Sequence, residues 1–182
     1  IATGINNDGV IVGGFESFVD DSFRSFIKDG ENLAEILIPW PDEAYVNDIN
    51  DAGVMVGGAF DGNAINGFIL ADGVVELVIH PDGDSELIAV NNRGVMAGSV
   101  GPSNGPFSAF VFDGSDFTEV AYPGAEETNV WGLNDGGVLV GSYLQNEREF
   151  AFIARPIPEP TSSWLLLAGL LAWAGVRRNA RV

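Results

Sequence analysis

The chain of 182 residues carries 26 Asp and Glu against 8 Lys and Arg, a formal net charge of −18, with 24 Gly and no Cys. The missing cysteines exclude disulfides, zinc fingers, iron–sulfur clusters and a thiol nucleophile, and the shortage of basic residues excludes nucleic acid as a partner. A hydrophobic share of 46% is too high for a disordered chain. The high glycine content favours a turn-rich β fold.

A turn signature recurs four times between residues 1 and 155. It consists of an aliphatic residue, Asn, two variable residues and Gly, and its Asn residues are spaced by 44, 41 and 43 positions. An Asn side chain accepts backbone hydrogen bonds within a turn, and Gly three positions later adopts a positive φ without steric cost. The signature therefore predicts tight turns between antiparallel strands at Asn6 and Gly9, Asn50 and Gly53, Asn91 and Gly94, and Asn134 and Gly137.

A second mark, a small residue followed by Phe, keeps the same phase. Its members are Phe26, Phe68, Phe110 and Phe152, each 42 positions after the last. Asp-Gly pairs at 29–30, 72–73 and 113–114 predict a further tight turn, and short apolar runs follow at 33–38, 74–79 and 117–121. Each period therefore predicts four short antiparallel strands.

The repeat predicts an all-β body over residues 1–155. Four strands in about 42 residues is the size of a β-propeller blade. A linear β-solenoid is the alternative, although its coils are usually shorter. The strand count comes to 15, so we expect an incomplete ring. Because export also requires an N-terminal signal, which the sequence lacks, we expect this chain to be the C-terminal part of a longer protein.

The two marks together resemble the HAF repeats, a family of extracellular repeats named for a His-Ala-Phe triplet. Here the His is absent and the second position is Ser25, Gly67, Ala109 or Ala151, so the resemblance rests on the Phe and on the Asn-x-x-Gly turn. It implies an extracellular β-repeat architecture and assigns no catalytic residues.

The Asn-x-x-Gly and Asp-Gly turns should share one end of the sheets, because successive turns of a meander alternate between ends. Asp8, Asp51 and Asp135 in these turns offer hard oxygen ligands and make calcium a candidate ion. Residues 48–53 do not keep the alternating acidic pattern of an EF-hand loop. We therefore expect these residues to serve turn formation and solubility, and we expect no cofactor.

At the opposite end, a ring-bearing residue precedes proline three times. Trp40, His80 and Tyr122 occupy this position, at spacings of 40 and 42. Such rings stack on the apolar faces of sugars, so these three residues are candidates for a glycan-binding site. The alternative is that each ring packs over the edge of a sheet.

Catalysis is not predicted. His80 is the only imidazole, and its position beside a proline in a loop gives it no activating context. No phosphate-binding loop or dinucleotide fingerprint occurs. With 25 acidic residues in the body, no carboxylate pair is distinguished as a glycosidase site.

The C-terminal segment differs in composition from the body. Residues 1–155 carry 25 acidic and 5 basic residues, whereas residues 156–182 carry 1 and 3. Closely spaced prolines predict an extended linker over 156–161. Residues 162–176 are uncharged and precede an arginine cluster, which predicts a transmembrane helix and basic tail over 162–182. Fifteen residues are short for a span, and a core helix is the alternative.

The order of Pro158-Glu159-Pro160, an apolar segment and Arg177, Arg178 and Arg181 resembles the PEP-CTERM sorting signal of Gram-negative bacteria. The resemblance implies cleavage by an exosortase, a membrane enzyme, and export of the body to the cell surface. In the inner membrane, the tail helix would contact the lipid bilayer with the body on the periplasmic side. Such proteins are often tied to exopolysaccharide or biofilm. We therefore expect a surface or matrix protein associated with exopolysaccharide. A structural spacer and a glycan-active hydrolase are the alternatives.

Overall fold

The computed structural model describes residues 1–20, 22–40, 43–102 and 105–156. Every regular element in these ranges is a β-strand that pairs antiparallel with the next strand of its sheet. The first sheet comprises β1 (Ala2–Ile5), β2 (Ile11–Glu16), β3 (Phe23–Asp29) and β4 (Asn32–Ile36), and the second comprises β5 (Ala44–Ile49), β6 (Met55–Phe60), β7 (Ile65–Ala71) and β8 (Val74–Val78). The third comprises β9 (Asp84–Val90), β10 (Met96–Gly101), β11 (Ser108–Phe112) and β12 (Phe117–Val120), and the fourth comprises β13 (Glu127–Leu133), β14 (Leu139–Gln145) and β15 (Arg148–Ala154).

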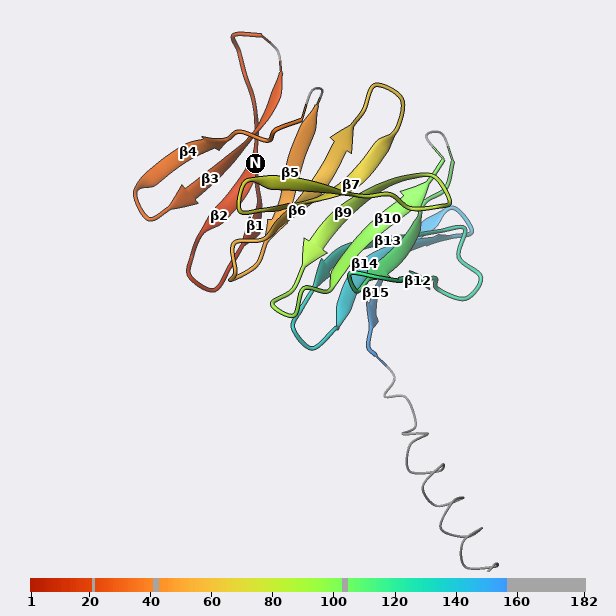
Figure 1. Cartoon of the computed structure of the whole chain (residues 1–182). Helices are drawn as coiled ribbons and strands as arrows, with labels where there is room; N and C mark the ends of the chain where they lie inside the picture. Colours follow the sequence, from red (N-terminus) through yellow and green to blue (C-terminus); the bar gives the residue numbers. More distant parts are fainter. Residues whose placement is uncertain (21, 41–42, 103–104, 157–182) are drawn as a thin grey trace, which may run out of the picture.

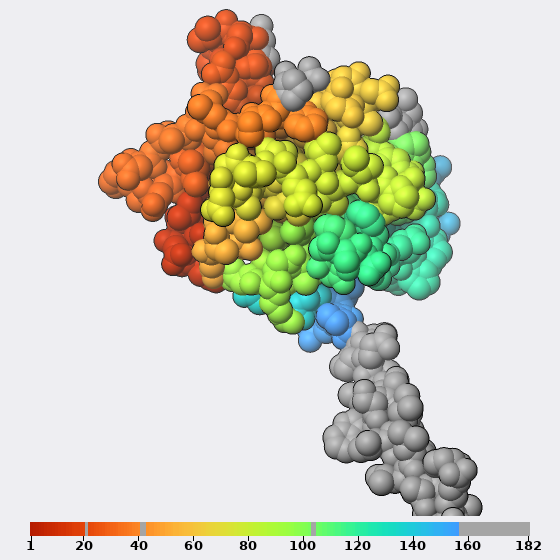
Figure 2. Space-filling model, viewed as in Figure 1, coloured from red at the N-terminus to blue at the C-terminus, as the bar shows by residue number. Residues whose placement is uncertain are grey.

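The four sheets follow one another and pack face to face (Figure 1). Contacts between sheets join the first to the second, the second to the third and the third to the fourth, and β5, β9 or β13 takes part in each of them. Figure 2 shows this succession on the surface, from the red and orange first sheet to the green and blue-green later ones. The arrangement is propeller-like, and the sequential antiparallel strand order excludes the linear solenoid.

The predicted four strands per period are confirmed in the first three sheets. The strands expected after the Asp-Gly turns are β4, β8 and β12, and each begins within one residue of the predicted position. The fourth sheet has three described strands, because the chain leaves β15 through Arg155 and Pro156.

The repeated Phe has a packing reason. Each Phe pairs in register with a glycine of the preceding strand: Gly13 with Phe26, Gly57 with Phe68, Gly98 with Phe110 and Gly141 with Phe152. The first strand of each sheet, β1, β5, β9 or β13, is called its inner strand. A Cβ on any of these glycines would lie under 3 Å from the Phe ring and would collide with a carbonyl oxygen in the inner strand or, for Gly13, next to it. The glycine therefore leaves the space that the ring of the paired Phe occupies.

The hydrophobic core is divided among the three interfaces between sheets. Each interface joins a residue of the second strand of one sheet to a residue of the inner strand of the following sheet, beside that sheet's repeated Phe. These sets are Val12, Val46 and Phe68, then Val56, Leu87 and Phe110, and then Ala97, Val130 and Phe152. No single sheet encloses a core, so each sheet is stabilised by its neighbours.

The predicted sorting residues and the predicted helix at 162–176 lie outside the described residues. Within the four described ranges, no helix is long and apolar enough to cross a membrane.

Candidate functional sites

The four Asn-x-x-Gly turns are bonded to one another across the sheets. In each turn, the Asn Oδ1 accepts the backbone N–H four positions later at 2.9–3.0 Å, and the Gly has a φ between 74° and 81°. The Nδ2 atoms of Asn6, Asn50 and Asn91 each donate to the main-chain carbonyl of the next repeat's Asn, at 3.1–3.3 Å. One side chain therefore closes its own turn and joins it to the next sheet.

Two of the three candidate calcium ligands bind the neighbouring turn. Asp51 accepts hydrogen bonds from the backbone and side-chain nitrogens of Asn7, both at 2.8 Å, and Asp135 accepts the same pair from Asn92 at 2.8 and 3.1 Å. Both hydrogen bonds lower the pKa of Asp51, and the one from the Asn7 side chain has the larger effect. Asp8 is exposed, and within the described part of the chain no group of three His, Asp or Glu is placed to hold a metal.

The inner strands line a cavity of about 400 Å³, and its walls include Thr3, Asp48 and Trp131. The Asp48 carboxylate accepts the N–H groups of Val90 and Ile49, each at 2.9 Å, and burial raises its pKa. Both oxygens are engaged, so Asp48 holds the second sheet against the third. The sequence pattern did not single out Asp48, because a register shift between Val46 and Asp48 decides where its side chain points.

The three ring residues before proline each pack against the following sheet. Trp40 Nε1 donates to the carbonyl of Phe60 at 2.7 Å. His80 lies against Phe110 and Phe117, with ring centroids 5.0 and 4.5 Å away, and is only 8% exposed. Tyr122 stacks on Tyr143 at 3.8 Å with the rings 6° from parallel, and it is 42% exposed. Burial therefore removes His80 from any sugar-stacking surface, and Tyr122 keeps an exposed ring.

Tyr122 belongs to an aromatic strip that also includes Tyr143 and Phe150. The Tyr143 and Phe150 rings lie 5.3 Å apart on opposite positions of β14 and β15, and Phe150 is 42% exposed. Sequence reasoning missed these two residues. The hairpin register could have identified them, because pairing Gly141 with Phe152 also places Tyr143 opposite Phe150.

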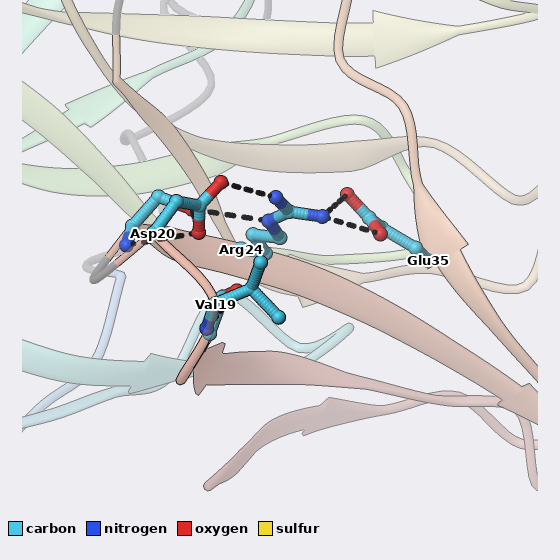
Figure 3. Close-up of polar contacts among 6 residues, drawn as sticks. Val19, Asp20, Arg24 and Glu35 are labelled. Carbon is cyan, nitrogen blue, oxygen red and sulfur yellow. Dashed lines mark hydrogen bonds and ion pairs between the residues drawn. The ribbon is translucent and has the colours of Figure 1, made fainter.

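Arg24 on β3 is held between two carboxylates (Figure 3). Its guanidinium lies 2.6 Å from Asp20 and 3.2 Å from Glu35. Hydrogen bonds from the Ser17 and Ser22 hydroxyls and from Arg24 lower the pKa of Asp20. The three charged side chains are 34–47% exposed, so solvent screens the pairs. With both partners engaged, Arg24 is not a free anion-binding group.

Arg24 also borders a cavity of about 520 Å³ between the first and second sheets. Other residues on its walls are Glu16, Phe23 and Glu43. The carboxylates on these walls exclude an anionic ligand by repulsion.

Residues 156–179 match the family model of the PEP-CTERM protein-sorting motif. This match supports a PEP-CTERM protein, and the motif implies processing by an exosortase and passage through the membrane to the cell surface. The match covers only the tail, and the resemblance of the body to HAF repeats stays a prediction. No curated protein matches the chain.

Two solved structures are similar to the body. TolB from Acinetobacter baumannii aligns with a TM-score of 0.56 at 9% identity, covering 83% of this chain and 42% of TolB. A putative gluconolactonase aligns with a TM-score of 0.46 at 15% identity, covering 84% of this chain and 62% of that one. The chain thus spans less than two thirds of either protein. At this identity, the likeness to TolB shows the fold alone.

Proposed function

We propose that an exosortase sorts this protein while its body lies on the periplasmic side of the inner membrane. The body then associates with exopolysaccharide at the cell surface. The aromatic strip of Tyr122, Tyr143 and Phe150 is the observation that carries the binding proposal. Two of its rings are 42% exposed, and Tyr143 supports the Tyr122 ring from below. A ring held in this way stacks on a pyranose without losing side-chain freedom on binding.

The charge of the body narrows the class of polysaccharide. Residues 1–155 carry 25 acidic residues against 5 basic ones, so a polyanionic chain would be repelled. Polar groups lie beside the strip: Gln145 donates to the Gly124 carbonyl at 3.1 Å, and Glu126 accepts the Asn146 N–H at 2.9 Å. Such groups suit sugar hydroxyls. We expect a neutral or amino-substituted glycan.

The proposed role is binding without catalysis. His80, the single imidazole, is buried, and its Nδ1 accepts the Asp82 N–H at 3.2 Å. Burial lowers its pKa, which the Asp82 charge opposes. A neutral ring packed between two phenylalanines is poorly placed to exchange protons with a substrate. This supports a binding role.

The test is affinity electrophoresis of the full chain in gels that contain a neutral β-glucan, a partly deacetylated chitin or alginate. The first or second polysaccharide should slow migration, and alginate should not. Tyr122→Ala should lose this retardation. Phe18→Ala is the matched control, because Phe18 is a 97% exposed ring away from the strip and its removal should change nothing.

A Tyr122→Ala protein with a native circular dichroism spectrum and undiminished retardation would refute the strip as the binding site. If none of the three gels slows the protein, the polysaccharide proposal fails, and a spacer role takes its place. Release of reducing sugar from any of them would instead establish a hydrolase.

A further inference from the structure

A cavity of about 390 Å³ lies on the side of the third sheet that packs on the second sheet. Its walls include Ser108 and Phe110 of β11 and Phe117 and Glu119 of β12. Phe110 and Glu119 are paired in register, and side chains two positions apart share one side of a strand. These four side chains therefore project from the same side of the sheet.

The loop between β8 and β9 brings a buried imidazole to this cavity. His80 is 8% exposed, and its Nδ1 accepts the Asp82 N–H at 3.2 Å. Burial lowers the pKa of His80, although the Asp82 charge opposes the shift, so the ring is neutral above pH 7. Because Nδ1 is the acceptor, the proton of the neutral ring resides on Nε2. His80 therefore has a hydrogen-bond donor on its second nitrogen.

This donor has no partner in the part of the chain that the structure describes. In the same residues, the fully buried side-chain atoms without a partner are Ser85 Oγ and Ser99 Oγ, and His80 Nε2 is not one of them. Since His80 lines the cavity, Nε2 opens into it. An unpaired donor on a buried side chain costs stability, and an acceptor atom of a ligand in the cavity would satisfy it.

The polar groups on the walls define the class of ligand. Asp82 and Glu119 add two carboxylates, which repel an anion and accept hydrogen bonds. A simple ammonium ion would pair with them, but it could not accept from His80 Nε2. A hydroxyl group both donates and accepts. No three His, Asp or Glu side chains within residues 1–20, 22–40, 43–102 and 105–156 are placed to hold a metal.

The shape and the apolar walls agree with a sugar. Phe117 is only partly buried and lines the cavity, so its ring is available to the apolar face of a pyranose. The volume lies at the small end of the range of about 300–1,000 Å³ that ligand pockets span. The cavity therefore suits one sugar ring rather than a longer stretch of polymer.

The equivalent place on the second sheet has neither of these polar groups. There the repeated Phe68 is paired with Leu77, where the third sheet has Glu119. Trp40 occupies the position of His80, and its Nε1 already donates to the Phe60 carbonyl at 2.7 Å. The combination of a free donor and a carboxylate is thus a feature of the third sheet and does not follow from the repeat itself.

We propose that this cavity binds a single neutral or amino-substituted pyranose ring. His80 Nε2 donates to one hydroxyl of the sugar, and Glu119 accepts from another. The contact is a hydrogen bond from a buried imidazole and differs from the ring stacking proposed for the aromatic strip. The inference does not rest on the proposed function, because neither Tyr143 nor Phe150 lines the cavity.

The single histidine makes the test direct. The full chain is labelled with ¹⁵N, purified without a histidine tag and kept at pH 7.5 in a detergent that has no sugar headgroup. Its imidazole ¹⁵N signals are followed while methyl β-D-glucopyranoside, D-glucosamine or D-glucuronate is added. The first or the second sugar should shift the Nε2 signal with saturation, and glucuronate should not.

Two carboxylate variants show whether the cavity is responsible. Glu119→Ala should raise the dissociation constant about tenfold, because a hydrogen bond to a charged acceptor is lost. Glu119 is exposed, so this variant should keep the native circular dichroism spectrum. Glu76→Ala is the matched control, since Glu76 is also an exposed carboxylate on the last strand of its sheet but does not line the cavity. Its dissociation constant should be unchanged.

Tyr122→Ala separates this site from the aromatic strip. It should lose the retardation in polysaccharide gels and keep the sugar-dependent shift of His80. The cavity proposal is overturned if neither the neutral nor the amino sugar gives a saturable shift in the natively folded chain. An equal response to glucuronate, or equal affinity in Glu119→Ala and Glu76→Ala, would overturn it as well. None of these results alters the outcome expected for gel retardation.

Discussion

Replacing Asn50 with Ala probes the bonds between the turns most directly. Asn50 is 6% exposed, and its side chain makes three hydrogen bonds: Oδ1 accepts the Ala52 and Val54 N–H groups at 3.0 Å, and Nδ2 donates to the Asn91 carbonyl at 3.2 Å. Asn134→Ala is the matched control. It is exposed, and among the described residues its side chain makes one hydrogen bond, accepting the Val138 N–H at 3.0 Å.

The expected difference follows from counting bonds. At about 1 kcal/mol net for each hydrogen bond, and more where a buried donor loses its partner, Asn50→Ala should lower the free energy of unfolding by about 3–4 kcal/mol. The same reasoning gives about 1 kcal/mol or less for Asn134→Ala, because water replaces the lost acceptor at an exposed turn. The buried position should therefore cost about three times as much as the exposed one.

Urea unfolding of the full chain in non-ionic detergent, followed by tryptophan fluorescence, measures both variants. Comparison of the midpoints is valid if the slope of the transition is unchanged. Equal midpoint shifts for the two variants would refute the reasoning. They would show that the hydrogen bond from Asn50 to the Asn91 carbonyl adds no stability beyond that of the bonds within the turn. Asn91→Ala, which also removes three bonds at a buried site, should behave like Asn50→Ala.

Two further predictions concern the substitution of glycines and the pH dependence caused by the buried His80. Gly57→Ala should destabilise the protein by about 3 kcal/mol, because its Cβ would collide with the Tyr45 carbonyl. Gly73→Ala, with a φ of 75° and nothing within 4 Å, should cost only about 1–2 kcal/mol in the same urea assay. Burial lowers the pKa of His80, so the unfolded chain takes up the proton first, and stability should fall as pH drops below 6.5. In His80→Phe that part of the pH dependence should vanish, and an unchanged pH profile would contradict the buried neutral ring.

Features that depend on a few neighbouring residues were predictable. The Asn-x-x-Gly and Asp-Gly turns, the four strands per period and the propeller-like succession of sheets follow from local turn chemistry and a fixed period. The candidate sites were less predictable. Trp40, His80 and Tyr122 occupy equivalent places, yet each meets a different group on the following sheet: a main-chain carbonyl for Trp40 and aromatic rings for His80 and Tyr122. Their shared motif contains no information about that neighbour.

The sequence alone determined that each repeat forms a hairpin at its Asn, since the hydrogen bonds that close the turn lie within five residues. Only the tertiary structure decided that the same Asn reaches an acceptor 41–44 residues away, and that Asp51 and Asp135 join turns. It also decided which apolar face is covered: the Val12 and Val140 positions are alike in sequence, but the second sheet covers Val12, whereas none of the described sheets covers Val140. Burial is a property of the neighbour, and the neighbour is fixed by packing between sheets.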